Sequence, residues 1–212
     1  MKIALIGASG FVGAAVLKEA VARGHSVTAI VRNPEKVEAP SNVSVIAADV
    51  TDQHRLAELL RGQDVVISAF NGGWGNPDIY ARHLSGSKAI AAAAKSAGVR
   101  LIEVGGAGSL YAPDGSQFVD SPEFPAEWKD GARAARDALT ALKEGDWKDW
   151  TFVSPAFVLA PGERTGAYRL GGENPVFDDK GESRISVKDL AVALVDEAET
   201  PKHIGRRFTL GY

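Results

Sequence analysis

Three glycines spaced by two residues each, Gly7, Gly10 and Gly13, join an apolar run at residues 2–6 to a helix-like run at residues 14–20. Gly7 permits a tight turn out of a strand, Gly10 lets backbone N–H groups approach a ligand, and Gly13 lets a helix pack against the strand. Such a helix offers unpaired N–H donors and the positive end of its dipole to an anion. The spacing therefore predicts a strand–turn–helix that binds a diphosphate, with a ligand-free tight turn as the alternative.

Short apolar runs alternate with longer helical patterns along the chain. Runs this continuous indicate strands buried on both faces, as in a parallel sheet. Strand and helix in alternation imply right-handed crossovers, so the predicted fold is α/β, a Rossmann-type doubly wound parallel sheet with helices on both faces. The predicted strands are 3–7, 27–31, 43–47, 65–70, 101–104, 151–154 and 206–212, and the predicted helices include 11–23, 52–61, 79–97 and 187–199.

Length and composition favour one domain covering residues 1–212. Of the 212 residues, 45% are apolar, which is enough for one sizeable core. Two segments that contain several glycines and prolines, 108–125 and 156–185, are predicted to be long loops. Loops after the later strands of a doubly wound sheet lie at its carboxyl edge, so we expect these two to form the substrate side of a site.

Charge and residue types exclude several kinds of function. With 24 basic and 27 acidic residues the formal charge is -3, so nothing indicates a nucleic-acid partner or an anionic membrane surface. The absence of cysteine excludes disulfides and thiolate chemistry, and the four histidines lack metal-ligand spacing, so no metal is expected. No apolar run approaches the roughly 20 residues of a membrane span and no leader is evident, so we expect a cytoplasmic protein. We further expect a monomer or a homodimer.

The spacing G-x-x-G-x-x-G resembles that of extended and atypical short-chain dehydrogenase/reductases. Further segments continue the resemblance over essentially the whole chain, and together they are similar to the NAD(P)H-binding NADH-flavin reductase group, which is related to biliverdin-IXβ/flavin reductase. These segments are 31–34, 48–50, 105–110, 161–166 and 185–191.

The second predicted strand ends in Arg32, about 20 residues beyond the glycine loop, where NAD sites usually carry a carboxylate. An arginine there suits the 2′-phosphate of NADPH, with help from Ser9, although NADH remains open and Arg32 could instead be a solvated surface residue. The resemblance implies that Asp49 and Val50 meet the adenine, and Asp49 could instead only begin a helix. The resemblance further implies a ribose contact at Ala69, Phe70 and Asn71. It also implies that the nicotinamide carboxamide is held by Ser154, Pro155, Ala156 and Phe157. The remaining predicted cofactor residues belong to the glycine loop: Gly7, Ser9, Gly10, Phe11, Val12 and Gly13.

The catalytic Tyr-x-x-x-Lys pair of most short-chain dehydrogenases is missing. None of the four tyrosines has a lysine four residues later, and the stretch 124–132 contains no tyrosine. Because carbonyl reduction needs a proton donor, this argues against a sugar epimerase, a dehydratase or an alcohol dehydrogenase. Reduction of a flavin or quinone does not depend on such a donor in the protein, because the ring is itself a good hydride acceptor.

Ser109 and Tyr111 follow the fifth strand and are the predicted catalytic hydroxyls, which would orient a planar acceptor; each could instead only cap or pack the loop. Arg164 and Tyr168 could cover that acceptor or simply face solvent. The sequence thus predicts an NAD(P)H-dependent oxidoreductase that transfers hydride to a flavin, a quinone or a similar planar acceptor. The alternatives are a non-catalytic NADP-sensing protein like the nitrogen-metabolite-repression regulators and, with less support, an NAD-dependent epimerase or dehydratase.

Overall fold

The computed structural model describes all 212 residues, Met1 to Tyr212. Strands and helices alternate regularly up to residue 154, after which three of the strands are only three residues long. The strands are β1 (Lys2–Ile6), β2 (Ser26–Val31), β3 (Val43–Ala47), β4 (Val65–Ser68), β5 (Arg100–Val104), β6 (Trp150–Ser154), β7 (Val158–Ala160), β8 (Arg169–Gly171), β9 (Arg184–Ser186) and β10 (Arg206–Gly211). The α-helices are α1 (Phe11–Ala22), α2 (Gln53–Leu60), α3 (Ile79–Ala97), α4 (Ala126–Glu144) and α5 (Val187–Glu199), and the 3-10 helices are η1 (Pro34–Lys36), η2 (Ala107–Ser109) and η3 (Phe118–Asp120).

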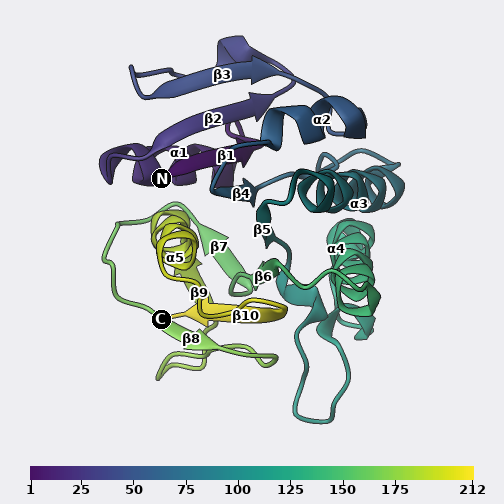
Figure 1. Cartoon of the computed structure of the whole chain (residues 1–212). Coiled ribbons are helices and arrows are strands. Elements are labelled where there is room, and N and C mark those ends of the chain that lie inside the picture. Colours follow the sequence, from purple (N-terminus) through teal and green to yellow (C-terminus); the bar gives the residue numbers. More distant parts are fainter.

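Eight strands form one sheet in the order β3-β2-β1-β4-β5-β6-β10-β8 (Figure 1). The first six strands and β10 are parallel, and only the edge strand β8 runs antiparallel, against β10. Helices α1 and α5 cover one face, and α2, α3 and α4 cover the other. The predicted doubly wound Rossmann fold is confirmed, and its order reverses at β1, which places the carboxyl ends of β1 and β4 beside a crevice.

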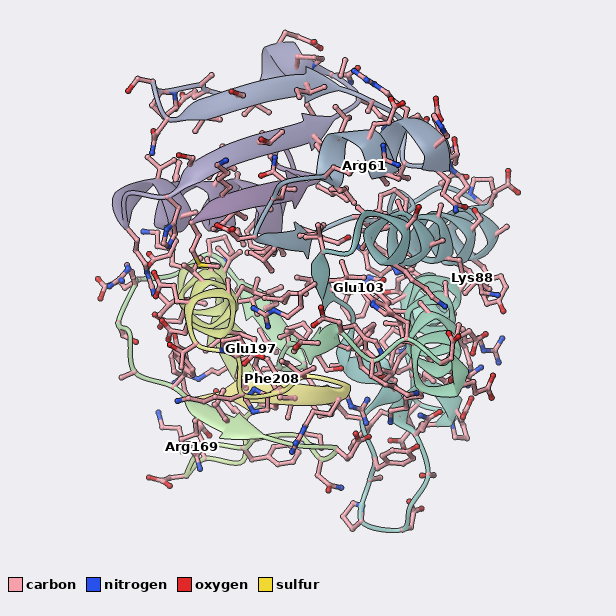
Figure 2. The ribbon with its side chains drawn as sticks, viewed as in Figure 1. Arg61, Lys88, Glu103, Arg169, Glu197 and Phe208 are labelled. Atoms are coloured by element: carbon pink, nitrogen blue, oxygen red, sulfur yellow. The ribbon has the colours of Figure 1, made fainter.

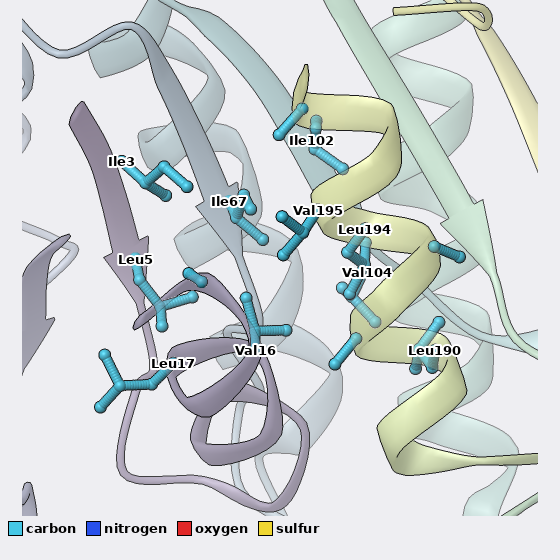
Figure 3. Close-up of a cluster of buried hydrophobic side chains, with 14 of the residues drawn as sticks. Ile3, Leu5, Val16, Leu17, Ile67, Ile102, Val104, Leu190, Leu194 and Val195 are labelled. Atoms are coloured by element: carbon cyan, nitrogen blue, oxygen red, sulfur yellow. The ribbon is translucent and has the colours of Figure 1, made fainter. Parts of the chain in front are cut away.

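Two apolar layers, one on each face of the sheet, explain the continuous apolar strands. Alternate residues of β1 enter different layers: Leu5 packs under α1 and α5, and Ile6 packs under α2 and α3. Figure 3 shows the first layer, where Val16 of α1 and Val195 of α5 meet over the sheet. A central strand buried on both sides leaves no room for polar alternation.

Local signals fix the ends of several helices. The side chain of Asp52 accepts a hydrogen bond from the Arg55 amide at 3.0 Å and begins α2. Gly98, with φ of +68°, ends α3 in the left-handed conformation. None of the helices combines the length and apolar character needed to cross a bilayer.

The segment 156–185 differs from the predicted loop, because it contains β7, β8 and β9. Strands β7 and β9 pair in parallel as a separate two-stranded sheet, and β8 extends the main sheet. Three-residue strands are too short to carry a periodic pattern, and their residues are mostly exposed or half-buried, so burial does not impose the continuous apolar runs seen in β1 to β6.

Candidate functional site

The glycine loop lies against the end of β4. Gly7 has φ of +81°, and a Cβ on it would be 2.7 Å from the carbonyl oxygen of Ala69. A Cβ on Gly13 would be 2.1 Å from the carbonyl oxygen of Gly7. Both glycines are therefore required by the backbone itself, as a tight turn and as a close helix–strand contact.

The amino end of α1 presents backbone donors that the chain itself does not use. No side chain caps this helix at Gly10, and the amides of Phe11, Val12 and Gly13 have no acceptor within the chain. Gly10 has φ of -84°, which any residue adopts, and a Cβ there would touch only the Gly7 oxygen at 3.3 Å. Glycine at this position thus keeps space open in front of three donors, and that arrangement fits the diphosphate of a dinucleotide.

The ends of β2 and β3 carry the residues predicted at the adenosine half. Arg32 is exposed at the end of β2, and no carboxylate pairs with it. The carboxylate of Asp49 accepts from the amide and the hydroxyl of Thr51, at 2.9 and 2.7 Å, and these bonds lower its pKa. Asp49 therefore shapes the turn that leads to α2, and the nearby positive charge of Arg32, which forms no salt bridge, helps to lower the pKa of Asp49.

At the end of β4, the side chain of Phe70 is used for packing. Its ring stacks on His83 with centroids 5.8 Å apart, and it fills the space over Gly86, where a Cβ would be 2.3 Å away. Asn71 accepts a hydrogen bond from the Gly73 amide at 2.8 Å. Ala69 and Phe70 therefore present backbone rather than side chains beside the glycine loop.

Three phenylalanines from different loops meet at the carboxyl edge, and we call them the phenylalanine cluster: Phe118, Phe157 and Phe177. The rings of Phe118 and Phe157 lie edge to face with centroids 4.7 Å apart, and those of Phe157 and Phe177 are 6.1 Å apart. Phe157 is 41% exposed and Phe177 is 44% exposed, although Ser154 and Ala156 just before Phe157 are buried. Exposed aromatic rings that are already gathered form a ready surface for a flat ligand.

Ser109 and Tyr111 differ sharply in accessibility. Ser109 is 1% exposed, and its Oγ accepts from Nη1 of Arg207 at 2.8 Å and lies 3.5 Å from the Gly106 carbonyl oxygen. Tyr111 is half-buried, and its hydroxyl has no hydrogen-bond partner within the chain. The catalytic roles of both stay predictions.

Arg164 and Tyr168 bind helices rather than covering the phenylalanine cluster. Arg164 donates to both carboxylate oxygens of buried Glu19 on α1, at 2.7 and 2.8 Å. The Tyr168 hydroxyl donates to Asp196 on α5 at 2.5 Å. The contact between Arg164 and Glu19 borders a cavity of about 500 Å³ beside α1, and Phe11 also lines that cavity.

Two buried titratable side chains near the carboxyl edge of the sheet, Glu103 and His83, were not predicted from the sequence. Glu103 of β5 points into the interior on the side of α3 and α4 (Figure 2), and desolvation raises its pKa to about 7. Burial lowers the pKa of His83 to about 4. A charged residue inside an apolar run was the one available sequence signal for Glu103.

The parallel strand order and the glycine loop define a dinucleotide-binding Rossmann protein. A family model described as NAD(P)H-binding matches residues 7–200. The Bacillus subtilis protein named uncharacterized protein YwnB is 41% identical over 214 residues, which cover 99% of this chain and 98% of that protein.

Crystal structures of two relatives superpose over the whole chain. A proposed NADH-flavin reductase from Streptococcus pneumoniae has a TM-score of 0.88 at 41% identity, covering 100% of this chain and 99% of the other. A proposed epimerase from Bacteroides thetaiotaomicron has a TM-score of 0.91 at 45% identity, covering 100% and 96%. The chain therefore belongs to the NAD(P)H-binding family of atypical short-chain dehydrogenase/reductase proteins, and its cofactor class is a nicotinamide dinucleotide.

Proposed function

We propose that the protein is an NADPH-dependent reductase that transfers hydride to a flavin, a quinone or a similar planar acceptor. The phenylalanine cluster is the observation that carries this proposal, because it offers exposed aromatic surface at the end of the segment 154–157, which is expected to hold the nicotinamide carboxamide. The bound cofactor would supply the hydride. The protein would supply the amides of α1 for the diphosphate and an aromatic surface that orients the acceptor.

Arg32 supports the choice of NADPH. An exposed guanidinium without a carboxylate partner can bind a 2′-phosphate by two parallel hydrogen bonds, whereas NAD sites need an acceptor for the 2′-hydroxyl. An epimerase is less well supported, because α4 has no tyrosine and the hydroxyl of Tyr80 on α3 is bound to Asp137 at 2.7 Å.

A steady-state assay tests the proposal. We expect NADPH oxidation, followed at the nicotinamide absorbance, with FMN and with menadione as acceptors. Each aromatic contact contributes about 0.5–1.5 kcal/mol, so Phe157→Ala and Phe177→Ala should each raise the acceptor KM roughly 2- to 12-fold. Leu170→Ala is the matched control, because it removes a similarly exposed apolar side chain from β8, and it should leave the acceptor KM unchanged.

A non-catalytic NADP sensor is the second candidate, and the burial of Ser109 favours it, because that hydroxyl is already bound by Arg207. A sensor would bind NADPH tightly and show no acceptor-dependent turnover in the same assay. That result would contradict the reductase proposal. The cytoplasmic location and the monomeric or dimeric state stay predictions.

A further inference from the structure

Arg207 is a fully buried arginine on β10, with no exposed side-chain surface. A buried cation is costly unless it is paired and hydrogen-bonded. The next residue, Phe208, faces the apolar layer under α1 and α5, so Arg207 points to the opposite face of the sheet. An apolar side chain could fill that place without the desolvation cost, so the buried charge calls for a structural or functional explanation.

The guanidinium contacts both of the residues predicted at the acceptor. Its Nη1 donates to the carbonyl oxygen and to Oγ of Ser109, each at 2.8 Å. Its Cζ lies 5.7 Å from the centroid of the Tyr111 ring. Its Nη2 pairs with the carboxylate of Glu173, which follows β8.

Glu173 and its neighbour hold the same loop by its backbone. The Tyr111 amide donates to the Glu173 carbonyl oxygen at 2.9 Å, and the Asn174 side chain donates to the Tyr111 carbonyl oxygen at 3.0 Å. The Gln117 side chain adds a bond to the Ser109 carbonyl oxygen at 3.1 Å. The loop after β5 is thus bound on both sides of Tyr111, yet the hydroxyl of Tyr111 has no partner.

We propose that Arg207, paired with Glu173, is the positioning residue that fixes Tyr111 toward the acceptor. The inference rests on the proposed reductase function. Arg207 satisfies the hydroxyl of Ser109, which makes Ser109 an anchor of the loop and leaves Tyr111 as the hydroxyl available to hydrogen-bond an acceptor carbonyl. A lysine cannot replace the guanidinium, because one ammonium does not match the fork that reaches two atoms of Ser109 and a carboxylate together.

A double-mutant cycle tests whether the ion pair acts through Tyr111. With menadione as acceptor, Tyr111→Phe and Glu173→Gln should each lower kcat/KM about 10-fold, the size of one lost hydrogen bond near 1.4 kcal/mol. The Tyr111→Phe/Glu173→Gln double variant should lose little more than either single variant, and the Kd for NADPH should stay within about twofold. Independent, multiplying losses would overturn the proposal, as would a parallel loss of NADPH affinity.

Arg207→Lys should lower kcat/KM with menadione as much as Glu173→Gln does. Arg206→Gln is the control, because Arg206 is an exposed neighbour on β10, and it should leave kcat/KM at the wild-type value. If Arg207→Lys does not fold, Glu173→Gln carries the test, because Glu173 is 42% exposed in its side chain. Hydrogen exchange separates this inference from the reductase function. In Glu173→Gln, amides of residues 107–117 should exchange about 10-fold faster while those of residues 7–13 do not change, even if the wild type reduces no acceptor. Unchanged exchange in residues 107–117 would overturn the positioning role.

Discussion

The glycine loop makes two kinds of demand on its glycines, and alanine substitutions separate them. In Gly10→Ala the new methyl meets only the Gly7 oxygen at 3.3 Å, and the backbone conformation suits alanine. We expect a loss of about 1 kcal/mol of stability for the poorer helix cap, which lowers Tm by about 2–4 °C. Because a Cβ on Gly10 would otherwise meet open space next to the α1 amides, we expect the methyl to displace the diphosphate.

The loss of one hydrogen bond to a charged group costs about 1.5–3 kcal/mol, so NADPH should bind Gly10→Ala roughly 10- to 150-fold more weakly. In Gly13→Ala the methyl would be 2.1 Å from the Gly7 oxygen and 2.9 Å from the Ala8 Cα. Backbone atoms cannot rotate away, so α1 must shift, at about 3 kcal/mol or more, which lowers Tm by about 6–12 °C.

Calorimetric titration with NADPH and thermal unfolding of each variant measure the two effects. Gly172→Ala is the matched control, because a Cβ there meets nothing within 4 Å, and it should leave both quantities unchanged. The reasoning is refuted if Gly10→Ala binds NADPH within twofold of the wild type, or if Gly13→Ala unfolds at the wild-type temperature.

Two further substitutions test the cofactor preference and the buried carboxyl. Arg32→Gln should weaken NADPH binding about 10-fold and leave NADH binding unchanged in parallel titrations, and equal losses for both would contradict a 2′-phosphate contact. Glu103 stays protonated in the folded protein up to a pKa of about 7, whereas in the unfolded chain it ionises near 4.5, so it destabilises the fold as pH rises between these values. Glu103→Gln should remove this penalty, which is on the order of 3 kcal/mol in the free energy of unfolding. In urea unfolding the variant should therefore be more stable than the wild type at pH 7.5 and equally stable near pH 4.5. A stability difference that does not depend on pH would refute this prediction.

The strands and the glycine loop could be predicted because their causes are local. A strand buried on both faces must be apolar throughout, the turn at Gly7 needs the positive φ of that residue itself, and the close contact at Gly13 is with the backbone of Gly7 and Ala8. The cap at Asp52 and the end of α3 at Gly98 follow from side chains or backbone angles within one turn. The absence of Tyr-x-x-x-Lys was likewise readable directly from residue spacing.

The acceptor side could not be predicted in the same way, because its contacts join residues far apart in the chain. Arg207 reaches Ser109 across 98 positions, and Arg164 reaches Glu19 across 145. The sequence placed Ser109 and Tyr111 after the fifth strand but did not show that one hydroxyl would be bound by a buried guanidinium and the other left free.

The sequence by itself therefore determined the sheet, the phosphate loop and the kind of cofactor, since hydrophobic periodicity and the backbone conformation of a glycine turn are set within a few residues. Only the tertiary structure decided which side chains of the later loops gather at the carboxyl edge and which of them remain accessible. Burial and ion pairing depend on the distance between atoms in the folded chain, and sequence separation does not set that distance for the phenylalanine cluster or for Arg207.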